Sequence, residues 1–496
     1  MTVPISSKAL LSWEPVKLIN SLKLQQPHSV ASLELSPADL LFDYYNSVLL
    51  VYDGRQAAAL VDATVPGPLP TTAEAADAEP VKRLQQALEE MLVHYPCAGG
   101  LVVYNDTAGR LEVRYPIACR SNGTNGSSTA HHISTYDDDE SPAANTYGVP
   151  FHVAHANVSL ADLGDMSMPQ PSLDVLYPSK PPHCVDGKGH PLPRFVMAFQ
   201  VTTFKCGGFT LGHTCSHAYA DGFTCAAFLQ NLCSIARGAG LANPLQSIPW
   251  RRAVIRAREP FSPIIPPRYI KSKKYTEPEG KQIHYGISTR YKFSMDALEA
   301  LRASVSTPGV QSKPCSRNRA LMALLWTAFA RVSRVVHGLP GSHEMDLRVP
   351  MNMRTRGLPV GYMGNALCHL SVVATLEELC EKPVAFVVDK IKKTMDGLDV
   401  NECLQSTVDY VELQLRDGMT PFIVGLGMTS LVGLPFYDTD CGWGAPAYVG
   451  RPSKQLSNMC IILDHPAVRA WNVLVVFASV EEQACFQETI AKYITS

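Results

Sequence analysis

The residues best able to do chemistry lie together near the middle of the chain, in the segment Gly212–Gly222, which reads GHTCSHAYADG. A strand-like run precedes it and a helical stripe of apolar residues follows it, so we expect it at a strand-to-helix junction. Side chains at such junctions are held by rigid elements and still open into a cleft. The imidazole of His217, with an ordinary pKa of about 6.5, could accept a proton from a hydroxyl or an amine. Taken alone, the same residue fits a packed core histidine equally well.

A metal site is the alternative reading of this segment. His213, His217 and Asp221 are spaced i, i+4, i+8, which on a continuous helix would place all three on one face. A zinc-protease pattern needs a glutamate after the first histidine, where Thr214 stands, and the flanking glycines indicate a turn. The 14 cysteines also lack metal-finger spacing, so we expect no metal, and we expect the cysteines to be reduced thiols.

Helices and strands alternate around this segment. Before it we expect a helix that stops by Tyr95-Pro96, because a residue before proline leaves the helical region. After it, an apolar stripe closes at Arg237-Gly238, a cation and a glycine placed as helix ends prefer. Strands are predicted at 101–104, 111–115, 195–204 and 209–212.

The second half of the chain repeats this alternation. A helix is predicted at 320–335, and Thr375 with Glu378 forms a capping-box pattern ahead of an apolar stripe that ends at Met395. A strand at 473–478 and a helix from Glu481 follow. The fold class is therefore α/β. No P-loop, GxSxG or GxGxxG motif occurs, which removes the commonest nucleotide-binding and serine-hydrolase classes.

The length of 496 residues predicts two large domains. We expect a first domain at 1–238 and a second at 283–496. Prolines recur without periodicity across 239–282, which favours an extended linker. The stretch 120–147 is rich in Ser, Asn, Gly and Asp and is predicted to be a surface insertion.

Composition excludes several classes of partner. A formal net charge of -2, with 46% hydrophobic and 18% charged residues, is typical of a globular protein and provides no basic surface for nucleic acid. The N-terminus lacks a signal-peptide pattern, and we find no apolar run long enough to span a membrane. We therefore expect a cytoplasmic protein without a membrane partner, and a monomer.

Two motifs together resemble those of the plant BAHD acyltransferases, HxxxDG and DFGWG. Here they are His217–Gly222 and Asp440–Gly444, the second reading DCGWG with Cys441 in place of the usual phenylalanine. Their order and their separation by more than 200 residues make coincidence improbable. Further landmarks in the expected order are Asp39, Tyr95–Gly100, Phe204–Gly208, Arg354–Arg356, Gly361–Asn365 and Leu434–Tyr437.

The resemblance implies two similar mixed-sheet domains with a solvent channel between them. Acyl-CoA would enter from one face as co-substrate and a small-molecule acceptor from the other, with His217 as general base where they meet. The implied reaction is transfer of an aromatic or aliphatic acyl group to a hydroxyl, or less readily an amine, of a plant specialised metabolite. Neither a metal nor a permanently bound cofactor is implied.

The resemblance also suggests roles for individual residues. Asp221 would turn away from the substrate and pair with an arginine, for which Arg354 is the candidate. Asp440 would stabilise the conformation of the loop Asp440–Gly444. Trp443 would line the channel or donate its indole N–H to the oxyanion, unless it is a packed core tryptophan. The structural residues of the site are thus Asp221, Gly222, Arg354, Asp440, Gly442 and Gly444.

Binding residues follow from the same likeness. Ser316 and Arg317, before a helix, and Arg356 would contact CoA phosphates through helix amides and guanidinium forks. In transferases that use shikimate or quinate, an arginine precedes the Leu-Pro of the acceptor loop, whereas this chain has Gly433 there. We therefore expect an uncharged acceptor, in a pocket formed by Leu431, Val432, Gly433 and Phe436.

Two rival functions remain. A carrier-protein-dependent acyl transfer or condensation enzyme would use the same HxxxDG base, although this chain has no attached carrier domain. A catalytically silent acyltransferase-fold protein would bind a metabolite or a partner. The retention of both His217 and Gly442–Gly444 argues against the silent protein.

Overall fold

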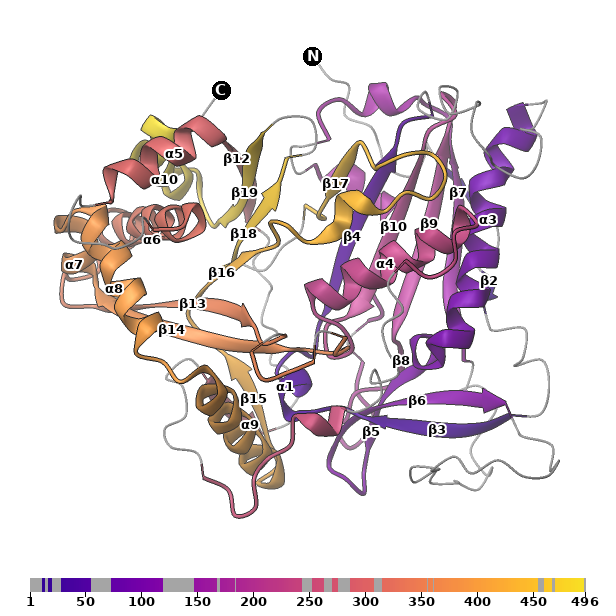
Figure 1. Cartoon of the computed structure of the whole chain (residues 1–496), viewed down its shortest axis with the longest axis horizontal. Helices are drawn as coiled ribbons and strands as arrows, with labels where there is room; N and C mark the ends of the chain where they lie inside the picture. The colour runs from indigo at the N-terminus through magenta and orange to yellow at the C-terminus, as the bar shows by residue number, and fades with distance from the viewer. Residues whose placement is uncertain are drawn as a thin grey trace.

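Two large β-sheets, each covered by helices, lie side by side in the molecule (Figure 1). The computed structural model describes residues 11–13, 17–19, 28–54, 73–118, 147–166, 170–182, 184–242, 252–262, 270–274, 286–306, 315–354, 356–359, 361–453, 459–465 and 469–494. The predicted surface insertion lies, apart from Tyr147, outside these residues. The α/β class and the two-sheet architecture predicted from the sequence are confirmed.

The first sheet carries the segment that contains His217. Its order is β1 (Leu11–Trp13), β7 (Val149–Ala156), β9 (Met197–Phe204), β10 (Phe209–Ser216), β4 (Tyr45–Tyr52) and β17 (Tyr448–Gly450), with β2 (Lys17–Ile19) also paired to β7. Every residue of β9 and β10 is buried. This burial follows because α3 (Ala73–His94) and α4 (Gly222–Ala236) lie over one face while residues of 160–166 and 170–177 pack on the other.

The second sheet has the order β12 (Ile287–Ser294), β19 (Ala470–Phe477), β18 (Met459–Asp464), β16 (Leu426–Ser430), β13 (Glu344–Asn352) and β14 (Leu367–Thr375). Its principal helix is α6 (Arg317–Val335), most of whose residues are buried. Around α6 pack α5 (Met295–Ser304), α7 (Leu376–Glu381), α8 (Val384–Asp396) and α10 (Val480–Ile490).

Smaller elements complete the structure. A third sheet has the order β3 (His28–Glu34), β6 (Arg110–Ala118), β5 (Leu101–Asn105) and β8 (Arg194–Phe195), and a two-stranded sheet pairs β11 (Ile270–Lys274) with β15 (Met419–Ile423). The remaining helices are the short α1 (Pro37–Leu40) and the long α9 (Val400–Arg416). The predicted hairpin at 101–115 is confirmed as β5 and β6.

One strand from the C-terminal half of the chain belongs to the first sheet. Strand β17 belongs to the C-terminal half, yet it pairs with β4 in the first sheet, with Val449 opposite Leu50. A boundary placed between 238 and 283 therefore separates the two sheets in all but this strand. The described part of the proline-rich stretch contributes β11 and a single turn at Arg252–Val254.

Two predictions need correction. Thr375 caps a short helix, α7, which ends before Pro383, and the apolar stripe forms the separate helix α8. Proline lacks the N–H that a continuous helix would need there. The cysteines are not all free thiols, because Cys233 of α4 and Cys441 form a disulfide. Among the described residues, no helix is long and apolar enough to cross a membrane.

Candidate active site

His217 lies directly after β10, where the chain turns toward α4. Its backbone N–H donates to the carbonyl of Tyr44 at 2.7 Å, which extends the pairing of β10 with β4. The ring is stacked on Phe42 at a centroid distance of 4.5 Å and lies 4.9 Å from Tyr44. Burial lowers the pKa of His217 below its ordinary value, although the carboxylate of Asp221 offsets part of the effect. The ring is therefore neutral at physiological pH, the form that a general base needs.

The peptide turn that carries His217 is held by a buried arginine. Arg252 donates to the carbonyls of Ala218 and Tyr219, at 3.1 and 2.5 Å. Its guanidinium also pairs with the carboxylate of Asp39 at 2.9 Å, and both side chains are almost fully buried. The planar guanidinium of Arg252 thus fixes the two backbone carbonyls that follow His217.

The second sheet reaches the same turn through Asn365. Its side-chain amide donates to the carbonyl of His217 at 2.7 Å and to Asp39 at 3.0 Å. Its backbone N–H donates to the same carboxylate at 2.8 Å. A single buried polar cluster therefore surrounds the backbone at His217. Its members are Asp39, Arg252 and Asn365.

Asp221 begins α4 and faces away from His217. Its carboxylate caps the helix by accepting from the backbone N–H of Thr224 at 2.9 Å. Arg354 binds both carboxylate oxygens, at 2.8 and 3.2 Å. Burial alone would raise the pKa of Asp221, but the guanidinium and the cap hydrogen bonds outweigh it and lower the pKa. The carboxylate is thus a permanently charged structural group.

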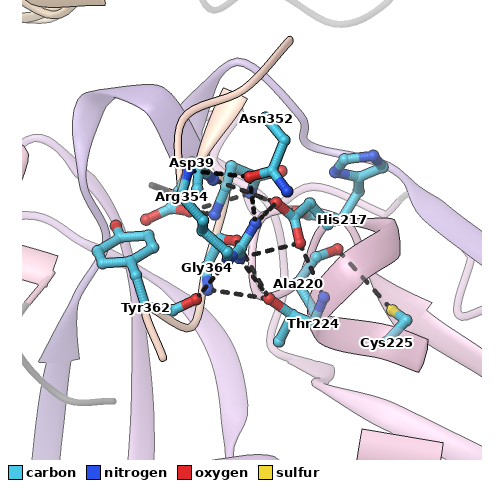
Figure 2. A network of polar contacts seen from close by, with 12 residues as sticks. Asp39, His217, Ala220, Thr224, Cys225, Asn352, Arg354, Tyr362 and Gly364 are labelled. Atoms are coloured by element: carbon cyan, nitrogen blue, oxygen red, sulfur yellow. Dashed lines mark hydrogen bonds and ion pairs between the residues drawn. The ribbon is translucent and has the colours of Figure 1, made fainter. Parts of the chain in front are cut away.

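Arg354 comes from the loop after β13 and ties that loop to the first sheet (Figure 2). It also donates to the hydroxyl of Thr224 at 2.9 Å and to the carbonyls of Tyr362 and Gly364. In Figure 2 the ring of His217 points away from this network. The structure brings together Asp221 and Arg354, as the resemblance implied, and gives them an architectural position.

The loop 440–444 is organised by Asp440. One of its carboxylate oxygens accepts from the backbone N–H groups of Gly442 and Gly444, at 2.8 and 2.9 Å. Both glycines have positive φ angles, which a residue with a side chain rarely adopts. The other oxygen lies 3.4 Å from Arg237, at the end of α4. The loop is therefore fixed against the C-terminal end of that helix.

Trp443 is not brought to His217. Its ring packs edge-on against Phe209 at 5.2 Å, with Arg83 of α3 over its face. Phe209 is the first residue of β10 and His217 follows the last, so the strand separates the two positions by roughly 23 Å at about 3.3 Å per residue. This placement does not support a role for the indole at the oxyanion, and it favours the packed core tryptophan.

His213 belongs to the strand and not to a helix. It lies within β10, where its ring packs against Phe199 at 4.7 Å. Burial lowers its pKa to about 3, so it is a neutral core residue. His213, His217 and Asp221 are divided among a strand, a turn and a helix cap. Within the described ranges, no group of three or more His, Cys, Asp or Glu side chains is placed to hold a metal.

The predicted CoA-binding residues lie at the N-terminal end of α6 and after β13. Ser316 caps α6 by accepting from the backbone N–H of Arg319 at 3.2 Å. Arg317 is partly exposed and pairs with Glu299 of α5. Arg356 is exposed.

The predicted acceptor residues divide between two environments. Leu431 lies against the start of α4, where a Cβ added to Gly222 would come within 3.1 Å of it. Gly433 lines an open cavity of about 630 Å³ together with Arg469 and Trp471. Val432 packs against the core of the second sheet. Phe436 is buried in the core of the first sheet.

Sequence reasoning missed several residues near the base. Phe42 and Tyr44, which enclose the His217 ring, belong to no motif. Arg252 lies in the proline-rich stretch that was predicted to be a linker. No local signal singles it out, because Arg251, Arg256 and Arg258 lie close to it in the sequence. Its partners are 33 or more residues away and cannot be read from spacing.

Comparison with known proteins places the chain in a family. The model described as "Transferase family" matches residues 143–491. The chain belongs to the Transferase family. This is the family of the BAHD acyltransferases, so the protein is a BAHD acyl-CoA-dependent acyltransferase.

Two curated relatives of this BAHD acyltransferase differ in their acceptors. Shikimate O-hydroxycinnamoyltransferase from Nicotiana tabacum is 27% identical over 424 residues, covering 82% of this chain and 87% of the relative. Hydroxycinnamoyl-CoA:5-hydroxyanthranilate N-hydroxycinnamoyltransferase from Avena sativa is 29% identical over 408 residues, covering 77% and 80%. Their names describe transfer to oxygen and to nitrogen respectively.

Two solved structures share the fold of this BAHD acyltransferase. Vinorine synthase matches with a TM-score of 0.63 and 19% identity, covering 98% of this chain and 99% of that one. TRI101 from F. graminearum, in complex with coenzyme A and deoxynivalenol, matches with a TM-score of 0.70 and 14% identity, covering 94% and 99%. The predicted two-domain CoA-dependent acyltransferase fold is confirmed.

Proposed function

We propose that this BAHD acyltransferase transfers an acyl group from a CoA thioester to a hydroxyl of a small plant specialised metabolite, with His217 as general base. The observation that carries the proposal is the state of the His217 ring. It is buried, its pKa is lowered, and no described residue bonds to its Nδ1. A neutral imidazole on a rigid strand-to-helix turn is suited to accept the proton of an incoming hydroxyl.

The reaction proceeds by direct transfer. His217 removes the hydroxyl proton as the acceptor oxygen attacks the thioester carbonyl. The tetrahedral intermediate collapses, the carbon–sulfur bond breaks, and the imidazolium returns the proton to the leaving thiolate, so the products are an ester and free CoA thiol. Arg252 and Asn365 hold the backbone around the base, and Arg354 with Asp221 holds the start of α4. These residues act by positioning, because none of them needs to change its proton.

For the binding of the co-substrate, we retain Ser316, Arg317 and Arg356 as candidate contacts of CoA. The N-terminus of α6 leaves backbone N–H groups that suit a phosphate. We also retain the division into a first domain at 1–238, a connecting stretch at 239–282 and a second domain at 283–496, with β17 as the strand that crosses it.

Transfer to an amine is the second candidate reaction, and the N-acylating relative from Avena sativa favours testing it. A neutral base at His217 serves either nucleophile, since an attacking amine also loses a proton. The bond formed in the product distinguishes the two reactions, because transfer to a hydroxyl gives an ester and transfer to an amine gives an amide.

A panel assay tests the proposed function. The purified chain is incubated with aromatic and aliphatic acyl-CoAs and a plant metabolite extract, and release of free CoA thiol is followed. We expect thiol release that depends on the extract, with an acylated product identified by mass spectrometry. An absence of turnover with every free acyl-CoA, together with turnover of an acyl group on a carrier protein, would favour the carrier-dependent rival.

A further inference from the structure

A guanidinium that forms no ion pair with any described carboxylate lies at the same end of the first sheet as His217. Arg451 directly follows β17, whose Gly450 is opposite Leu49 of β4. It donates to the side chain of Asn46 at 3.1 Å. Asn46 is opposite Cys215, which precedes His217 by two residues. The register of three neighbouring strands therefore places Arg451 near the base.

The charge of Arg451 is not compensated by the described protein. Among the described residues, no Asp or Glu forms an ion pair with it, and its Nε is buried without a hydrogen bond. Burial lowers its pKa, and the phenols of Tyr177 and Tyr44 offset only part of this effect. Arg451 is half-buried. A partly desolvated cation with no anionic partner is costly, and a bound anion would relieve that cost.

The positive charge of Arg451 affects the pKa values of His217 and of the neighbouring Tyr44. Arg451 lowers the pKa of His217 and counters the effect of burial on Tyr44, whose ring lies 4.9 Å from the His217 ring. Tyr44 directly precedes β4, whose second residue is Asn46, the hydrogen-bond partner of Arg451. Arg451 and the base thus lie at the same end of the first sheet.

A second arginine approaches from the opposite sheet. Arg348 of β13 donates to the carbonyl of Gly425 at 2.6 Å. Its charge acts on Tyr44, as that of Arg451 does, and on His369 of β14. The ring of His369 lies 5.6 Å from Phe42, which stacks on His217. Two cations from different sheets therefore converge on the surroundings of His217.

We propose that Arg451, with Arg348 across from it, binds a carboxylate carried by one of the two substrates beside His217. The phosphates of CoA are poor candidates for this place, because the long pantetheine arm separates them from the thioester carbonyl that must meet the base. The carboxylate belongs to the acceptor or to a dicarboxylic acyl group. This inference rests on the proposed acyl transfer, and it revises the expectation of an uncharged acceptor, which considered only the position of Gly433.

Matched ligands test the inference by binding, without requiring turnover. Calorimetry on the full chain compares shikimate, quinate and 5-hydroxyanthranilate with their methyl esters, which examines the acceptor. It also compares malonyl-CoA with propionyl-CoA, which examines the acyl donor. We expect an acid to bind roughly tenfold or more tightly than its neutral partner in one of the two arms. That arm then identifies which substrate carries the carboxylate.

Variants of Arg451 test whether this residue causes the tighter binding of the acid. Arg451→Gln should abolish it, and Arg451→Lys, which keeps the charge but loses the planar fork, should retain part of it. Arg331→Gln is the matched control, because the Arg331 side chain of α6 is exposed and pairs with Glu488 of α10. If Arg451→Gln does not fold, the reduced preference of Arg451→Lys serves as the test.

Two results would overturn the inference. One is the absence of any acid preference in both arms of the wild-type comparison. The other is a preference that persists unchanged in the Arg451 variants. Acyl transfer to a neutral acceptor alongside either result would leave the proposed function intact, whereas failure of all acyl transfer would count against the proposed function alone.

Discussion

Arg354 and Asp221 form a buried ion pair, although they are 133 residues apart in the chain. The guanidinium binds both carboxylate oxygens and so joins the loop after β13 to the N-cap residue of α4. The pair connects the two sheets directly behind the turn that carries the base. Its position gives the Asp221 carboxylate a structural role four residues after His217.

Asp221→Ala should lower stability and activity together. It removes a helix cap and leaves the Arg354 guanidinium buried and unpaired, at a cost of about 3–5 kcal/mol. Chemical denaturation measures the change in the free energy of unfolding. Asp389→Ala is the matched control, since Asp389 pairs with Lys393 on an exposed helix surface. A variant of normal stability that is selectively inactive would place the Asp221 carboxylate in the chemistry.

Arg252→Met should impair turnover more than binding. The variant loses both carbonyl contacts that fix the turn after His217, and a small displacement of the base lowers kcat by roughly 10–100-fold. The KM for acyl-CoA should change little. Steady-state kinetics measures both constants, with Arg237→Met at the partly exposed end of α4 as control. An unchanged kcat in folded Arg252→Met protein would contradict the positioning role.

Trp443 should matter for stability and not for the chemical step. Trp443→Ala removes a large buried ring from its contact with Phe209 and should cost about 3–5 kcal/mol of unfolding free energy. Trp443→Phe keeps an aromatic ring and should retain kcat. A folded Trp443→Phe variant that loses turnover would restore the indole N–H as a donor in the reaction.

Acid should destabilise the protein through buried histidines. His213 and His369 both have pKa values lowered to about 3, chiefly by burial. Because the unfolded chain binds these protons near pH 6.5 and the folded chain does not, stability falls as pH drops from about 6.5 toward 3. Denaturant unfolding at several pH values measures this slope, which should be shallower in His213→Leu. An identical slope in that variant would show that other groups cause the loss.

The sequence identified the two family motifs but not the residues that support the turn at His217. His217–Gly222 and Asp440–Gly444 are local motifs, and each forms a compact turn whose bonds lie within a few residues, such as Asp440 to Gly442. Asp39, Arg252 and Asn365 meet only after folding, since Asp39 and Asn365 are 326 residues apart. Their partners could not be read from spacing.

Local patterns also misjudged the helix after Thr375. The apolar stripe from Val384 was assigned to the Thr375 cap, although Pro383 divides it into two helices. The expectation of an uncharged acceptor considers Gly433, whereas the proposed carboxylate contact, Arg451, follows the edge strand β17. The pairing of β17 with β4 cannot be read from the acceptor loop.

The central claim is that His217 is the general base of an acyl transfer from CoA, and the rate of CoA thiol release by His217→Ala tests it most directly. With the acyl-CoA and acceptor found to turn over in the wild type, we predict a loss of about 10²–10⁴-fold in kcat, because the variant cannot remove the acceptor proton. The affinity for acyl-CoA, measured by calorimetry on the same preparation, should be unchanged. A folded His217→Ala protein that releases thiol at nearly the wild-type rate would contradict the account.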